Sequence, residues 1–220
     1  MRGWLARRWS RRQRRELSVA AADLRIPETL PTLQTARLIL RPLRGGDAAD
    51  LFAYAADPEV TRYLPWEPHR SVDDSRRFLE DVLERDRRRR PDTWGIVDRA
   101  TGQVIGTIRL GEYSPAHARA SVGYALGRPH WNRGLTTEAL GAVLRFGFTE
   151  VGLHRIYAYC HVDNAASERV MQKAGMTYEG TLREAMRVKG GYESRKLYAI
   201  LRSDWATRQG GAEGQGPQGR

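Results

Sequence analysis

Residues 119–162 limit the fold more strongly than any other part of the chain. They contain a strand-like "RASVGYAL", a helical "GLTTEALGAVLRFGFTEVG" and a second strand-like "RIYAYCHV". The apolar positions of the helical segment fall on one face, at Leu140, Val143, Leu144, Gly147, Phe148 and Val151. A strand, helix, strand unit crosses over with a right hand. The two strands should therefore be parallel or nearly so, with ligand space at their carboxyl ends.

The flanking segments predict antiparallel strands. "TWGIVD", "QVIGTIRLGEY" and "RASVGYAL" are joined by short connections and indicate a meander, and "TYEGTLREAMRV" and "YESRKLYAIL" indicate a hairpin through "KGG". A strand at 37–43 precedes them. Helices are expected after Asp47, after Ser71 with Asp74 as a capping box, and over "NAASERVMQKAG". The predicted fold class is α+β, with a mixed sheet flanked by helices.

Positive charge is concentrated at the N-terminus of the 220-residue chain. Seven of the eleven net positive charges come from arginines within residues 1–15, which contain no acidic residue. We interpret residues 1–30 as a flexible basic arm, 31–207 as the folded domain and 208–220 as a disordered tail rich in Gly and Gln. The arm could contact RNA, a ribosome or an anionic membrane surface, or it could be a solvated segment without a partner.

Cysteine content and hydropathy indicate the compartment. A single cysteine, Cys160, excludes an intrachain disulfide framework and fits a reducing environment. No apolar run approaches the roughly 20 residues that span a bilayer, and no apolar segment follows the basic start as in a secretory signal. We therefore expect a cytoplasmic protein without a membrane span. The sequence leaves both a monomer and a homodimer open.

The stretch "HWNRGLTTEALG" at 130–141 places a glycine and two threonines where the central helix should begin. The first N–H groups of a helix have no partner inside it and carry partial positive charge, so they stabilise an anion. Gly134 would let phosphate oxygens reach the amides of Gly134, Leu135, Thr136 and Thr137, while Arg133 adds charge. A diphosphate fits this cradle, although Gly followed by Thr is also an ordinary helix start.

Several motifs in the same order resemble the GNAT superfamily of acetyl-CoA-dependent N-acetyltransferases. They are "GYAL", "GRPHWNRGLTTEAL", "LHRIYAYCHVDNAASERVMQKAGM", "YEGTLRE" and "LYAIL", within a likeness that runs from about Leu33 to Trp205. The likeness is strongest to the ribosomal-protein N-terminal acetyltransferase branch. It implies a mostly antiparallel mixed sheet splayed between its fourth and fifth strands, with acetyl-CoA in that wedge and its diphosphate on 133–137. Two positions depart from the family pattern: Thr136 replaces Gly or Ala, and Trp131 replaces Gln or Arg.

The resemblance also implies roles in transfer. A backbone N–H around Tyr124, Ala125 and Leu126 would stabilise the charge that develops on the carbonyl oxygen. Asn164 matches the position that binds the pantetheine arm, or it is only a helix cap. Ser167 matches a hydroxyl near the leaving sulfur, or it is an ordinary first-turn serine. Cys160 is not needed as a nucleophile and is expected in the core.

The general base is where the likeness is weakest, because close relatives carry a glutamate where this chain has Met186. Glu184 lies two residues earlier, on the same strand face if the strand is regular, and could act through a water. Glu193 and Glu112 are weaker candidates. Near neutral pH about a tenth of α-amines but under a thousandth of lysine amines are neutral. An enzyme without a strong base should therefore favour α-amines.

The loop "RYLPWEPHR" at 62–70 precedes a predicted helix at the place where relatives bind the acceptor. Tyr63, Trp66 and Glu67 are expected to line this opening, together with His161, which could instead be packed against a tyrosine. The same loop could instead be pinned to the surface by Trp66. The five histidines show no metal-ligand spacing, so no metal is predicted.

The sequence thus predicts transfer of acetyl from acetyl-CoA to a protein N-terminal amine. Two alternatives remain open: an enzyme for a small amine such as an antibiotic or polyamine, and a non-catalytic acyl-CoA sensor or RNA-associated module.

Overall fold

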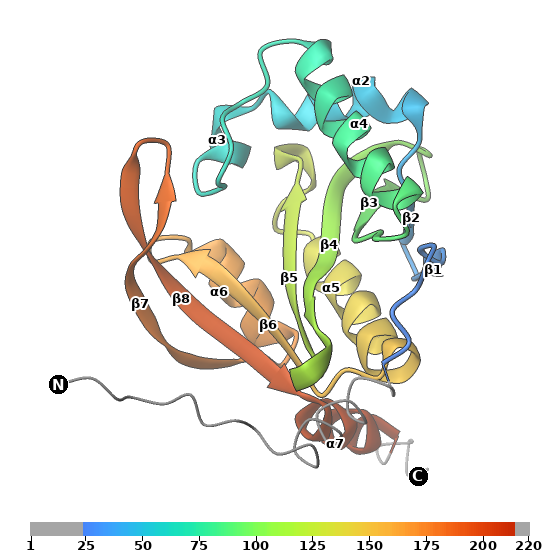
Figure 1. The fold of residues 1–220 in the computed structure, drawn as a ribbon, viewed down its shortest axis with the longest axis vertical. Helices are drawn as coiled ribbons and strands as arrows, with labels where there is room; N and C mark the ends of the chain where they lie inside the picture. Colours follow the sequence, from blue (N-terminus) through green and yellow to red (C-terminus); the bar gives the residue numbers. More distant parts are fainter. Residues whose placement is uncertain (1–23, 214–220) are drawn as a thin grey trace, which may run out of the picture.

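The computed structural model describes residues 24–213, which form one sheet with helices on both faces (Figure 1). The sheet has eight strands in the order β1-β2-β3-β4-β5-β6-β8-β7. They are β1 (Leu33–Gln34), β2 (Leu38–Pro42), β3 (Thr93–Asp98), β4 (Val104–Ser114), β5 (Arg119–Leu126), β6 (Arg155–His161), β7 (Thr177–Val188) and β8 (Gly191–Leu201). Every neighbouring pair is antiparallel except β5 and β6, which are parallel. The predicted α+β class, meander and hairpin are confirmed.

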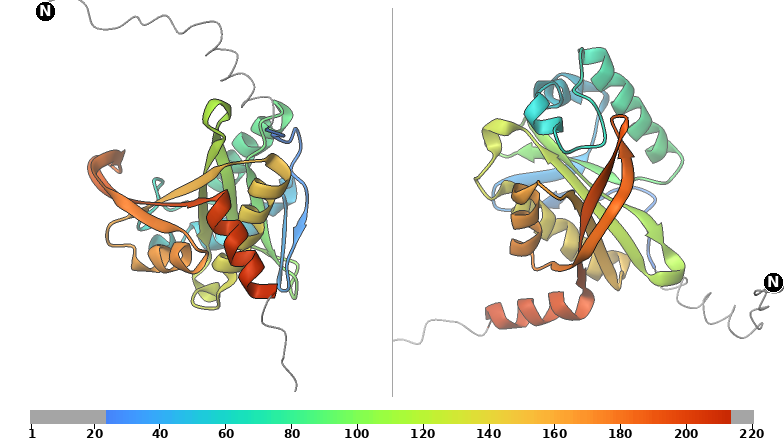
Figure 2. Two further views of the ribbon diagram at one scale, coloured as in Figure 1. Left: turned by 90° about the horizontal axis from the view of Figure 1, so that it is seen from below. Right: turned by 90° about the vertical axis from the view of Figure 1, so that its left-hand side faces the viewer.

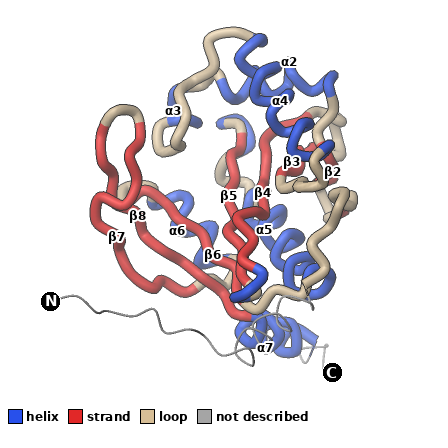
Figure 3. Tube along the Cα trace, in the orientation of Figure 1, coloured by secondary structure: helices blue, strands red, loops and turns tan. Residues whose placement is uncertain are grey.

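Six α-helices are described: α2 (Ala48–Ala55), α3 (Pro58–Thr61), α4 (Val72–Arg87), α5 (Leu135–Phe146), α6 (Ala165–Lys173) and α7 (Arg202–Glu213). The larger core cluster joins α5 and the strands, with Met171 of α6 buried in it, and the smaller one lies under α2 and α4. Figure 3 separates these helices from the strands by colour. No helix in the described part of the chain is both long and apolar enough to cross a bilayer.

The central helix follows the predicted periodicity. Leu140, Val143 and Leu144 are at most 1% exposed, and the helix continues as a π-helical turn, Gly147–Val151, which the sequence pattern does not reveal. Gly152 then ends it in the left-handed conformation, with φ of 87°. The helix therefore returns the chain to the start of β6, beside the start of β5.

Strands β5 and β6 are paired only at their first residues. The register joins Arg119 to Arg155, Ala120 to Ile156 and Ser121 to Tyr157, and stops there. Beyond these pairs the strands separate, and Figure 1 shows β6 leaning away from β5 toward its carboxyl end. The predicted splay is therefore present, and it opens where the ligand space was expected.

Both domain boundaries differ from the prediction. At the start, Leu30 is buried and the Arg25 N–H donates to the Val151 carbonyl, so residues 24–30 belong to the domain. At the end, α7 extends to Glu213 and packs through Trp205 against Phe148, below the end of β8 (Figure 2). Residues 208–213 are therefore helical rather than tail, because the first turn of α7 is anchored. Residues 1–23 of the predicted arm and residues 214–220 of the predicted tail lie outside the described residues.

Of two predicted helix starts, the one at Ser71 is confirmed and the one at Asp47 differs in its capping. The Asp74 carboxylate accepts from the Ser71 N–H at 3.1 Å, as in a capping box. Asp47 occupies the N-cap position of α2, but its carboxylate does not cap that helix. It accepts instead from the Arg44 N–H and pairs with both terminal nitrogens of Arg41, so its oxygens are engaged outside α2.

Candidate active site

A cavity of about 500 Å³ fills the splay between β5 and β6. Its walls are the carboxyl halves of these two strands, the first turn of α5, one face of α6, and α3 with the loop that follows. The core strands position the walls, because the buried residues of β5 and β6 pack against α5 and α6. The cavity thus lies at the carboxyl ends of the parallel pair, where α/β units bind ligands.

Alternation along β5 decides which backbone groups face the cavity. The Gly127 N–H donates to the Ile105 carbonyl at 2.8 Å, and β5 keeps an unbroken register with β4 from Val122 to Leu126. Since backbone groups alternate between the two edges of a strand, those of Tyr124 and Leu126 point away from β4 and into the splay. Ala125 lines the cavity as predicted, but its own N–H and carbonyl point toward β4. The donors at the splay are therefore Tyr124 and Leu126.

The first turn of α5 presents the expected cradle. Gly134 is the N-cap residue, in the left-handed conformation with φ of 73°, and it offers no side-chain cap. The first intrahelical bond of α5 runs from the Glu138 N–H to the Gly134 carbonyl at 3.0 Å. The N–H groups of Leu135, Thr136 and Thr137 consequently have no partner within the helix. Gly134 and these three residues all line the cavity, so an anion can approach their amides.

Glu138 fastens this turn to the edge of β2. Its carboxylate accepts from the Thr35 hydroxyl at 2.6 Å, from the Arg37 N–H at 2.8 Å and from Arg37 Nε at 2.7 Å. Arg37 also donates to the Arg133 carbonyl at 2.8 Å. Burial opposes ionisation, but these bonds hold the pKa of Glu138 below its ordinary value. The loop before α5 is therefore held in place by contacts outside the cavity.

The Arg133 side chain is exposed and is not among the residues that line the cavity, and its backbone carbonyl accepts from Arg37. Its predicted contribution of charge to the cradle stays a prediction. On α6 the cavity is lined by two cationic residues, Arg169 and Lys173, which the sequence pattern did not single out. These two residues are four positions apart on one helix, which places them on the same face.

Trp131 stands between the cradle and β5. Its indole N–H donates to the Leu126 carbonyl at 2.6 Å, while 38% of the residue stays exposed. The bond uses the carbonyl that points into the splay and leaves the Leu126 N–H available. Tryptophan at this position, in place of the family's Gln or Arg, therefore leaves the backbone N–H donors available and attaches the loop to the end of β5.

The N-terminus of α6 brings two predicted residues to the cavity. Asn164 caps the helix, its Oδ1 accepting from the Ser167 N–H at 3.0 Å, and its side-chain nitrogen has no hydrogen-bond partner among residues 24–213. Ser167 Oγ lies 3.0 Å from the Tyr124 hydroxyl. Both serine and asparagine line the cavity, so the helix cap and a ligand contact are compatible at Asn164.

Cys160 lies on the inner face of β6 and is 3% exposed. Burial and the nearby Glu168 raise the pKa of its thiol to about 11. A thiol with this pKa is almost wholly protonated near neutral pH and is a poor nucleophile. The expected core placement is confirmed.

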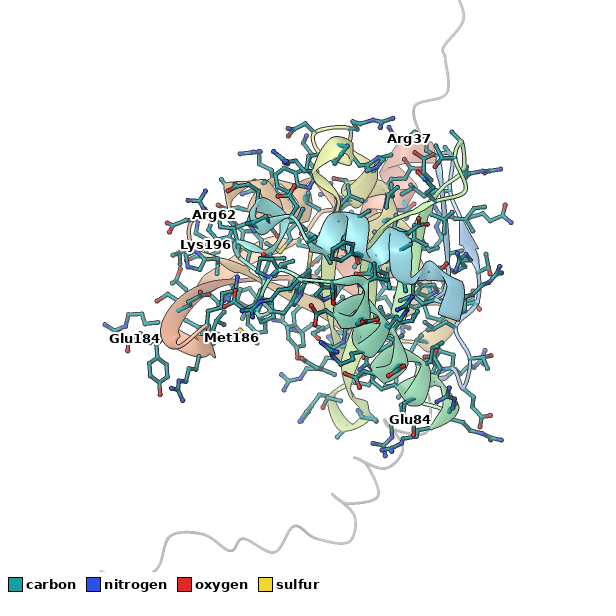
Figure 4. The ribbon with its side chains drawn as sticks, turned by 90° about the horizontal axis from the view of Figure 1, so that it is seen from above. Arg37, Arg62, Glu84, Glu184, Met186 and Lys196 are labelled. Carbon is teal, nitrogen blue, oxygen red and sulfur yellow. The ribbon has the colours of Figure 1, made fainter. Side chains whose placement is uncertain are left out.

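Glu184 is not in the cavity, contrary to the prediction. The register of β7 with β8 is interrupted between Leu182 and Met186, and Glu184 has φ of 48° within that bulge. The bulge breaks the two-residue alternation, so Glu184 and Met186 do not share a face. Met186 lines the cavity while 39% of it stays exposed, whereas Glu184 is exposed and does not line the cavity; in Figure 4 Glu184 lies at the outer edge of the hairpin.

The acceptor residues divide into two pairs. Tyr63 and His161 line the cavity and stack on each other, with ring centroids 5.1 Å apart. Trp66 and Glu67 do not line it. Trp66 packs instead against the core under α2 and α4 and contacts His69, which turns the loop away and leaves Glu67 exposed.

The sequence pattern did not identify Arg195 of β8 as a cavity residue, because no neighbouring residue in the sequence indicates that it is buried. It is 5% exposed, lines the cavity, donates to the Tyr63 carbonyl at 3.1 Å and pairs with Glu193. Glu193 is thereby engaged with Arg195 and does not line the cavity.

Two other carboxylates line the cavity, those of Glu59 and Glu112. Both side chains are more than half exposed, and each lies 3.7 Å from an arginine. Within residues 24–213 no cluster of His, Cys, Asp or Glu could hold a metal ion.

Comparisons with known proteins agree with this geometry. The family described as acetyltransferase (GNAT) domain matches residues 37–177. The chain is 36% identical over 172 residues to the uncharacterized N-acetyltransferase YoaA of Bacillus subtilis, covering 78% of this chain and 97% of the relative. The spermidine N(1)-acetyltransferase of Vibrio cholerae is 26% identical, with 78% and 97% covered. The ribosomal-protein-serine acetyltransferase of Escherichia coli is 31% identical over 99 residues, 45% of this chain and 55% of the relative.

A solved structure of a GNAT-family acetyltransferase from Bacillus anthracis superposes with a TM-score of 0.71 at 26% identity, over 79% of this chain and 99% of that one. The chain belongs to the GNAT acetyltransferase family. It is an N-acetyltransferase, and the members of this family use acetyl-CoA.

Proposed function

We propose that acetyl-CoA occupies the cavity with its diphosphate on the amides of Gly134, Leu135, Thr136 and Thr137. The fit rests on three unpaired amides at a helix start whose glycine leaves the approach open. The side-chain nitrogen of Asn164 and the N–H of Leu126 remain as donors for the rest of the molecule. Arg169 and Lys173 add positive charge to the wall of α6.

The cofactor supplies a reactive thioester, and the chain supplies position and hydrogen bonds. In this proposal the Tyr124 N–H donates to the thioester oxygen, and its direction away from β4 supports that role. Ser167 at the start of α6 donates to the departing sulfur. Tyr63 and His161 form the wall along which the acceptor amine enters.

The acceptor that fits this cavity best is a protein N-terminal α-amine. The observation that carries this proposal is Met186, an apolar side chain in the wall where the family resemblance places a base. The two carboxylates of the lining, Glu59 and Glu112, are more than half exposed, and each lies 3.7 Å from an arginine rather than being held inside the cavity. Since α-amines are partly neutral near pH 7 and lysine amines are not, an enzyme with these residues acts on α-amines. The similarity to a ribosomal-protein-serine acetyltransferase supports the same acceptor class.

A polyamine acceptor is the alternative that the spermidine acetyltransferase relative raises. The charged lining of the cavity argues against it, because five Arg or Lys residues accompany only two carboxylates: Arg62, Arg109, Arg169, Lys173 and Arg195 against Glu59 and Glu112. A polycation would be repelled by this wall.

The test compares kcat/KM for two peptides of the same sequence with acetyl-CoA, one with a free N-terminus and no lysine, the other N-terminally blocked with one lysine. Spermidine is the third acceptor. The proposal expects the free N-terminus to be preferred by at least tenfold, as the neutral fractions suggest. Preference for the lysine peptide or for spermidine would reject the acceptor assignment.

A further inference from the structure

The side chain of Tyr124 crosses from β5 to the first turn of α6. Its hydroxyl lies 3.0 Å from Ser167 Oγ and 3.2 Å from the Ser167 carbonyl oxygen, 43 positions away in sequence. Both residues line the cavity, and Tyr124 packs against the core beside it. The tyrosine is therefore fixed by packing, and within residues 24–213 its hydroxyl forms hydrogen bonds to one residue, a serine with a proposed role in transfer.

The hydroxyl groups of Tyr124 and Ser167 can be arranged in two ways, which differ in the group that accepts the tyrosine O–H. A tyrosine has one O–H to donate. If it donates to Ser167 Oγ, the serine hydrogen stays free to point into the cavity. If it donates to the Ser167 carbonyl, the serine hydrogen turns back to the tyrosine oxygen, and the cavity receives none. The shorter distance to Oγ favours the first arrangement, and the Ser167 carbonyl is already an acceptor within α6.

The tyrosine acts as a fixed donor and not as a source of protons. Burial raises the pKa of Tyr124 far above its ordinary value. The phenol therefore stays protonated throughout the working pH range, and giving up its proton would leave a buried phenolate. Its effect must pass through the direction it imposes on Ser167.

We propose that Tyr124 is a positioning residue whose hydroxyl orients the Ser167 hydroxyl toward the sulfur that leaves during acetyl transfer. This inference rests on the proposed function, which places the thioester in the cavity. It gives Tyr124 two roles. Its backbone N–H donates to the thioester oxygen, and its hydroxyl orients the serine that donates to the sulfur.

The test is the pKa of the CoA thiol bound to the enzyme, followed by the ultraviolet absorbance of the thiolate during a pH titration. A hydrogen bond from Ser167 stabilises the thiolate and lowers this pKa. Tyr124→Phe and Ser167→Ala should each raise it by about one unit, the size expected for one hydrogen bond. The double variant should match Ser167→Ala alone. In turnover, Tyr124→Phe should lower kcat about tenfold with little change in the KM for acetyl-CoA.

Tyr178→Phe is the matched control, since its hydroxyl bonds to Thr181 outside the cavity, and the bound thiol should titrate as in the wild type. An unchanged thiol pKa in Tyr124→Phe or in Ser167→Ala overturns the inference and leaves the cofactor site intact. A further increase when Tyr124→Phe is added to Ser167→Ala also overturns it, because the tyrosine would then act directly. Failure of wild-type protein to bind CoA rejects the proposed cofactor site and this inference together.

Discussion

The attachment of the α5 turn to β2 through Glu138 gives a prediction whose size follows from the contacts. Glu138→Gln keeps the shape of the side chain and one carbonyl oxygen, but it places an amide NH₂ against Arg37 Nε, a donor facing a donor. A hydrogen bond to a charged group contributes about 1.5–3 kcal/mol. Because the Arg37 side chain is 51% exposed, solvent reduces this value, and we expect a loss of about 1–2 kcal/mol.

The assay is urea unfolding between pH 7 and about pH 4. Folding lowers the pKa of Glu138 below its ordinary 4.5, so its contribution is present above that pH and is lost as the pH falls through the folded-state pKa. The difference between wild type and Glu138→Gln should be complete at pH 7 and should shrink below about pH 4.5. Near pH 7 the melting temperature should fall by about 2–4 °C for each kcal/mol.

Glu80→Gln is the control, an exposed glutamate of α4 without a hydrogen bond or ion pair to the rest of residues 24–213, and it should leave stability unchanged. The reasoning is refuted if Glu138→Gln is as stable as wild type at pH 7. It is also refuted if the difference persists undiminished in acid.

Four further substitutions test individual assignments. Gly134→Ala should destabilise the fold by about 1 kcal/mol and weaken CoA binding in calorimetry; the left-handed φ causes the strain, since an added Cβ would meet its nearest neighbour, Arg37, at an ordinary 3.6 Å. Cys160→Ala should retain kcat in a steady-state assay, and wild-type Cys160 should resist iodoacetamide at pH 8, whereas rapid alkylation of folded protein would contradict its buried placement. Glu184→Gln should leave kcat/KM unchanged, while Met186→Glu should raise the rate on lysine peptides; a large loss in Glu184→Gln would show that the hairpin bulge does not hold it away from the cavity.

Local sequence patterns predicted most of the fold for physical reasons that can be named. Apolar periodicity identified α5, and glycines such as Gly152 marked where helices end. The motif at Gly134 predicted the unpaired amides at the start of α5, because such amides depend only on neighbouring residues. These features depend on interactions between residues close in sequence.

The parts that the sequence did not predict depend on contacts between distant residues. A bulge in β7 decided that Glu184 and Met186 face differently, and a core contact decided that Trp66 turns away from the cavity. The sequence alone places Arg195 at the surface, but in the fold the loop at Tyr63 covers it and accepts its hydrogen bond. The pair of Tyr124 and Ser167 exists only because β5 and α6 meet across the splay.

The central claim is that the unpaired amides at the start of α5 bind the diphosphate, and amide resonances report this directly. We expect addition of CoA to a ¹⁵N-labelled sample to shift the N–H signals of Leu135, Thr136 and Thr137 downfield, as new hydrogen bonds would. Pantetheine, which lacks the diphosphate, should leave them in place. If CoA binds while these three signals stay where they are, the diphosphate is held elsewhere and the account of this site is wrong.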